Sequence, residues 1–118
     1  MIFVFHSSVL LRWVIVAAVL AAVTAAIAAS PGEAPFLGEN HAAMESMMRG
    51  MRVKPSGDVD RDFIAMMIPH HQGAIDMARA ELRYGHNEQL HRIAQEIIVD
   101  QQHEIAAMRL ALDEPLEQ

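Results

Sequence analysis

Two adjacent histidines lie among methionines in the second half of this chain. His70 and His71 follow Met66 and Met67 and precede Met77, and helical spacing places these side chains on or beside one apolar face. Thioether sulfur and neutral imidazole nitrogen are soft ligands that select copper, Cu(I) in particular, over hard cations. Each residue alone is more typical of a packed core, where methionine fills gaps. The cluster as a whole favours a metal site.

A second group of methionines lies upstream. Met44, Met47, Met48 and Met51 follow His41 at intervals that place them along one side of a short helix. They carry thioethers where leucine or isoleucine would ordinarily serve. Two interpretations stay open: a surface that captures copper, and a core stripe that packs on the rest of the protein.

Polar residues interrupt the apolar stripe of the last predicted helix. Gln101 and Glu104 lie on that stripe, and Met108 follows them. Buried amides and carboxylates cost free energy unless a partner satisfies them. In an antiparallel hairpin these residues come close to the level of His70 and His71. Glu104 would then either complete a ligand set or hydrogen-bond to one of the two histidines.

Helix signals predict an all-α fold, a small antiparallel bundle of three to four helices around a central hairpin of two long ones. We expect a short helix at Asn40–Met51 with Asn40 as its N-cap, a long helix from Asp60 or Asp62 to Tyr84, and a second long helix from Asn87 to about Leu112. Pro69 predicts a kink, either a tolerated bend or a device that aims the histidines.

The first part of the chain has the composition of an export signal. Residues 13–29 contain no charge and follow Arg12, and Ala26-Ile27-Ala28 is a small-x-small cleavage pattern. Residues 1–29 therefore predict a signal peptide, with an uncleaved membrane anchor as the alternative. We expect a flexible linker at 30–38 and a helical bundle domain at 39–118. Either alternative predicts a periplasmic or secreted location.

Composition excludes several classes of function. The formal charge is −6 over 118 residues, which argues against binding to nucleic acid. There is no cysteine, so disulfides, thiolate metal sites and cysteine nucleophiles are excluded. Nucleophilic catalysis has no support, and we expect no enzyme activity.

Two blocks of sequence resemble a known family. Residues 60–78, DRDFIAMMIPHHQGAIDMA, and residues 98–108, IVDQQHEIAAM, are similar to the signature of the domain of unknown function 305 family, over a core at 59–112. The resemblance implies a small, secreted, four-helix or ferritin-like protein, related to CopM-type periplasmic copper-binding proteins that support copper resistance. It also implies one inner cluster, formed by Met66, Met67, His70, His71, Met77, Gln101, Glu104 and Met108. The methionine helix lies outside this similarity.

Three readings of function follow. The leading one is copper sequestration or transport, with a periplasmic copper-handling protein as a further partner. A helical interaction module without metal is the alternative. A di-iron carboxylate enzyme is less favoured, because the chain has one Glu-x-x-His spacing, Glu88 to His91, and that chemistry needs two. With three helices after the apolar segment, a fourth helix comes from that segment if it is uncleaved, from a partner subunit, or is absent. At this core size a homodimer of hairpins is a reasonable expectation.

Overall fold

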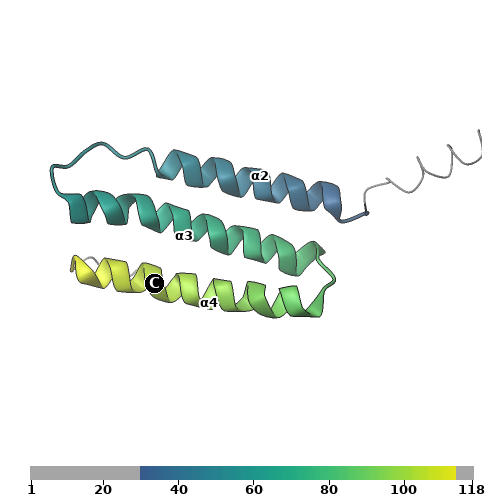
Figure 1. Ribbon diagram of the computed structural model, residues 1–118. Helices are drawn as coiled ribbons and strands as arrows, with labels where there is room; N and C mark the ends of the chain where they lie inside the picture. The colour runs from purple at the N-terminus through teal and green to yellow at the C-terminus, as the bar shows by residue number, and fades with distance from the viewer. Residues whose placement is uncertain (1–29, 114–118) are drawn as a thin grey trace, which may run out of the picture. The chain divides into compact units, whose positions relative to one another are not determined.

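The computed structural model describes residues 30–113, which form helices α2 (Glu33–Gly50), α3 (Val59–Tyr84) and α4 (Glu88–Ala111). The three helices lie side by side in one layer, with α3 in the middle and neighbours antiparallel (Figure 1). α3 packs against both α2 and α4, whereas α2 and α4 do not contact each other. The predicted all-α fold with a central hairpin of two long helices is confirmed.

Short polar side chains start both helices of the hairpin. The Asp58 side chain accepts hydrogen bonds from the backbone N–H groups at the start of α3, and Asn87 does the same for α4. These caps satisfy N–H groups that have no partner within the helix. α3 ends where Gly85 adopts an extended conformation, and a Cβ there would lie 2.7 Å from the Glu81 carbonyl oxygen. The predicted boundaries of the hairpin therefore hold to within a residue or two.

The first helix begins earlier than predicted. α2 starts at Glu33 with Gly32 as its N-cap, so the prediction that Asn40 is the N-cap was wrong. The Asn40 side chain instead donates to the Phe36 carbonyl oxygen inside the helix. Pro35 fits because the first turn does not need its N–H. Residues 33–38 of the predicted flexible linker are consequently helical.

Pro69 lies inside α3, which continues through it to Tyr84. Its ring packs against Gly50 at the end of α2, where an added Cβ would lie 2.6 Å from the Pro69 Cβ. One turn later on α3, Gly73 packs against Met47 of α2. A Cβ added at Gly73 would lie 3.0 Å from the Met47 Cβ. Small residues thus let α2 and α3 approach closely, and these contacts set residues 47–51 alongside residues 69–73.

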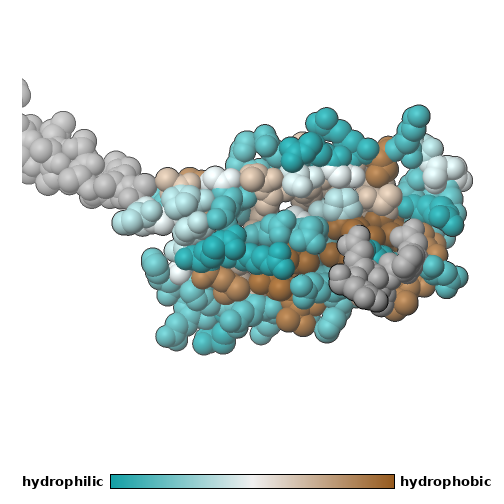
Figure 2. Space-filling model, turned by 180° about the vertical axis from the view of Figure 1, so that it is seen from behind, coloured by the Kyte–Doolittle hydropathy of each residue, from teal (hydrophilic) through white to brown (hydrophobic). Residues whose placement is uncertain are grey.

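The single layer encloses little core. Within the described residues the buried apolar side chains are Ala43, Ile64, Ile75, Ala78, Ala80 and Ala94. Only Ile75 among them is both large and fully buried. Figure 2 shows one face of the layer, on which hydrophobic side chains remain visible between hydrophilic ones. A layer of helices has two faces, and this one leaves apolar surface uncovered.

None of the helices within residues 30–113 is long and apolar enough to cross a bilayer. The predicted signal peptide or anchor at 1–29 lies outside the described residues.

Candidate metal site

His71 is a buried link between α3 and α4. Its Nδ1 donates to the Met67 carbonyl oxygen at 2.8 Å, since a carbonyl can only accept. Its Nε2 lies 2.6 Å from Glu104 Oε2, so a hydrogen bond joins the ring to the carboxyl group. The residue is 8% exposed. Both ring nitrogens are engaged, and His71 therefore acts as the hydrogen-bonded partner of Glu104.

His70 has the opposite environment. It is exposed, and within the described part of the chain no hydrogen bond engages either of its ring nitrogens. Its ring centroid lies 5.8 Å from that of His71. Neighbouring residues of a helix point about 100° apart, so His71 faces α4 while His70 lies on an open face of the layer. His70 is thus the histidine of the pair with a free nitrogen.

The methionines of α3 divide between the same two sides. Met66 and Met77 share a side with His70 by helical spacing, and Met77 is exposed while Met66 is half-buried. Met67 precedes His71 by one turn and is half-buried on the side that faces α4. The open face therefore carries His70 together with two of the three predicted thioethers of α3.

The methionines of α2 do not form one common surface. Met47 packs on Gly73, and Met51, one turn later, is half-buried. Met44 and Met48 are exposed. Met47 therefore packs on α3, as the core-stripe interpretation expects, whereas Met44 and Met48 face solvent. Copper capture by this set stays a prediction.

His41 is separate from the His70 cluster. Its Nδ1 lies 3.9 Å from Glu45 Oε1 on the outer side of α2, and its side chain is largely exposed. From α4, Gln101 and Met108 are half-buried on the helix that carries Glu104. Glu104 itself keeps a 59% exposed side chain while holding His71.

The donors available on the open face are chiefly sulfur and one imidazole. Within residues 30–113 no three His, Asp or Glu side chains gather where they could hold a metal ion. A hard cation, which needs several oxygen ligands, has no such set here. Thioethers together with one imidazole are a donor set that soft ions accept.

Sequence reasoning missed a polar clamp between α2 and the end of α3. Glu39 accepts hydrogen bonds from Arg83 Nε at 2.9 Å and from the Tyr84 hydroxyl at 2.8 Å. These bonds lower the pKa of the Glu39 carboxyl and raise the pKa of Tyr84. An isolated Glu39 gives no signal in the sequence, because its partners lie more than forty residues away.

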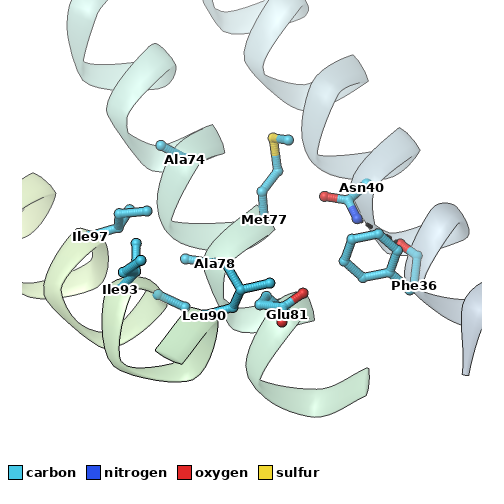
Figure 3. Close-up of a pocket in the computed structure, with 10 residues that line it drawn as sticks. Phe36, Asn40, Ala74, Met77, Ala78, Glu81, Leu90, Ile93 and Ile97 are labelled. Carbon is cyan, nitrogen blue, oxygen red and sulfur yellow. Dashed lines mark hydrogen bonds between the residues drawn. The ribbon is translucent and has the colours of Figure 1, made fainter. Parts of the chain in front are cut away.

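An apolar groove was also missed. It lies over α3, with residues of α2 and α4 on either side, near the hairpin turn (Figure 3), and its volume is about 370 Å³. Its lining consists of Phe36, Asn40, Ala74, Met77, Ala78, Glu81, Leu90, Ile93, Ala94 and Ile97. Met77 belongs to this groove as well as to the candidate site.

The Glu88 to His91 spacing does not form a pair of ligands. His91 Nε2 donates to the Gly85 carbonyl oxygen at 2.8 Å and so fastens the turn between α3 and α4. Glu88 is exposed in the first turn of α4. His91 therefore has a structural role in the turn, and its spacing from Glu88 needs no metal to explain it.

Comparison with known proteins identifies the family. No curated protein matches the chain. The model of the family described as domain of unknown function (DUF305) matches residues 21–112. This match extends well upstream of the predicted core at 59–112 and includes α2, so the expectation that the methionine helix lies outside the similarity was wrong. The chain belongs to the DUF305 family.

Proposed function

We propose that this protein binds copper, as Cu(I), outside the cytoplasm and sequesters or carries it. The observation that carries the proposal is the contrast between two neighbours. His71 is engaged through both ring nitrogens, whereas His70 is exposed, one turn from Met66, and no hydrogen bond within residues 30–113 engages its ring. A free imidazole beside thioethers is a donor set that suits Cu(I).

The proposed ligands come from two helices. His70 and Met66 lie one turn apart on α3. Met47 lies near the end of α2 and Met51 follows its last residue, where the chain packs beside residues 69–73. Thioethers need no deprotonation, so they remain ligands in a mildly acidic compartment. Small movements of the flexible methionine side chains would close this set around an ion.

Glu104 and His71 take a supporting role in this proposal. Their hydrogen bond fixes the part of α3 that carries His70 against α4. Met44, Met48 and His41 on the outer side of α2 would offer a first point of capture for the ion.

The location rests on the sequence of the first segment. Residues 13–29 are uncharged and end in a small-x-small pattern, which supports export to the periplasm or beyond. A periplasmic copper-handling protein would then be the natural recipient of the ion.

Metal retention and thermal melting test the proposal together. The protein is exposed separately to Cu(I), Cu(II), Zn(II) and Fe(II), dialysed, and analysed for bound metal and melting temperature. Retained copper with a raised melting temperature is the expected result, because a ligand that binds the folded state stabilises it. No retained copper and an unchanged melt would reject it.

A quadruple variant separates ligation from packing. Replacing Met44, Met47, Met48 and Met51 with leucine keeps apolar volume, so packing should tolerate it at a cost below about 1.5 kcal/mol per site. Copper binding should weaken, because leucine has no donor atom. Unchanged binding would exclude α2 from the ligand set.

A further inference from the structure

The apolar groove lacks a cover within the described part of the chain. Leu90, Ile93 and Ile97 of α4 form one wall, and Phe36 of α2 forms the other (Figure 3). The wall residues of α4 are 36–49% exposed although all three are large and apolar. Removing such side chains from water lowers the free energy, so a second surface that covers them would bind favourably.

The open face reaches the lower end of the size of stable protein interfaces. α2, α3 and α4 have 18, 26 and 24 residues, which gives about 27, 39 and 36 Å at 1.5 Å per residue. Three helices about 9 Å apart span about 18 Å between the outer axes. The face therefore offers about 600 Å² per partner, or about 1,200 Å² in total, where the range of stable interfaces begins.

We propose that a second copy of this chain covers the face, related to the first by a two-fold axis. Two layers of helices then enclose the core that one layer cannot. In such an interface the same patch serves on both subunits, so the face must be complementary to itself.

Met77 and Ala74 on α3 show that complementarity. Met77 is exposed and protrudes beside the small Ala74. A two-fold axis midway between them, perpendicular to α3, brings each Met77 opposite the small Ala74 of the other copy.

Charge argues against a highly charged partner. Among the described residues that line the groove, Glu81 is the one that carries a charge. A basic or acidic peptide would find no matching set of charges there, whereas a second copy brings an equally apolar surface.

Oligomeric state tests the proposal in the full chain, with a metal chelator present. Light scattering after size exclusion should give twice the mass of one chain. Ile97→Glu should raise the dissociation constant at least about tenfold. Val99→Glu, on an exposed residue that does not line the groove, should leave the dimer intact. Circular dichroism checks that both variants remain helical.

Disulfide cross-linking gives a second test of the interface, one that does not require weakening the dimer. The chain has no cysteine, so introduced cysteines are the only thiols. The double variant Ala74→Cys, Met77→Cys should form disulfide-linked dimers. A control with Gln95→Cys and Val99→Cys, exposed residues outside the groove, should not.

A monomeric wild-type chain would overturn the proposal and leave the groove to another occupant. A dimer that Ile97→Glu does not weaken, or that cross-links no better than the control, would overturn it too, because the interface would then lie elsewhere. Since these measurements need no metal, their outcome is independent of the copper proposal.

Discussion

Replacing each of the adjacent histidines with alanine should affect stability very differently. His71→Ala removes a buried ring and both of its hydrogen bonds, to Met67 and to Glu104. A neutral hydrogen bond contributes about 1 kcal/mol. The bond to Glu104 contributes little more, because that carboxylate is 59% exposed and screened by water.

The expected loss follows from adding the lost packing of the ring. His71→Ala should lower the free energy of unfolding by about 2–3 kcal/mol. For a domain of this size that is about 10–20 °C in melting temperature. His70→Ala should change stability by no more than about 0.5 kcal/mol, because His70 is exposed and none of its ring atoms is hydrogen-bonded within residues 30–113.

Urea unfolding followed by circular dichroism measures both variants at equal protein concentration without metal. Equal losses in the two variants, or no loss in His71→Ala, would refute the assignment of His71 as the structural histidine. Glu104→Ala gives a check on the pair. It should cost about 1 kcal/mol, less than His71→Ala, because the ring stays in place.

Two further predictions concern the packing of α2 on α3. Gly50→Ala should destabilise the fold by about 1–3 kcal/mol, because its Cβ would lie 2.6 Å from Pro69. Gly38→Ala in the same helix meets nothing within 4 Å and should stabilise the fold by about 0.5–1 kcal/mol. Urea unfolding compares the two variants, and an equally harmful Gly38→Ala would contradict the packing argument. The lowered pKa of Glu39 means that its contact with Arg83 stabilises the fold above the usual carboxyl range and is lost as pH falls through the folded-state value. The stability difference between wild type and Glu39→Gln should therefore shrink on acidification, and a difference that grows below pH 4.5 would contradict this sign.

Local signals allowed the hairpin to be predicted from the sequence. Asn87 caps α4 through its own side chain, and Gly85 ends α3 against its own helix. Such features depend on a few neighbouring residues. The start of α2 was missed because Pro35 and its flanking glycines resemble a loop, although proline is tolerated in a first helical turn.

The different roles of His70 and His71 could not be predicted from the sequence. Both lie near the apolar side of α3, and only the position of α4 decides that His71 meets Glu104. The difference between the packed Met47 and the exposed Met44 and Met48 likewise depends on how α2 packs on α3. Gly50 sets the side of α2 that approaches Pro69, and Met47 shares that side. The groove was missed because an arrangement of three helices in one layer is a tertiary feature.

The affinity for Cu(I) of a single variant tests the central claim most directly. Competition with a chromophoric Cu(I) chelator compares wild type, His70→Ala and His103→Ala, the last being an exposed histidine of α4 outside the proposed set. We predict that His70→Ala weakens Cu(I) binding at least about tenfold and that His103→Ala leaves it unchanged. Equal affinity in wild type and His70→Ala would contradict the account.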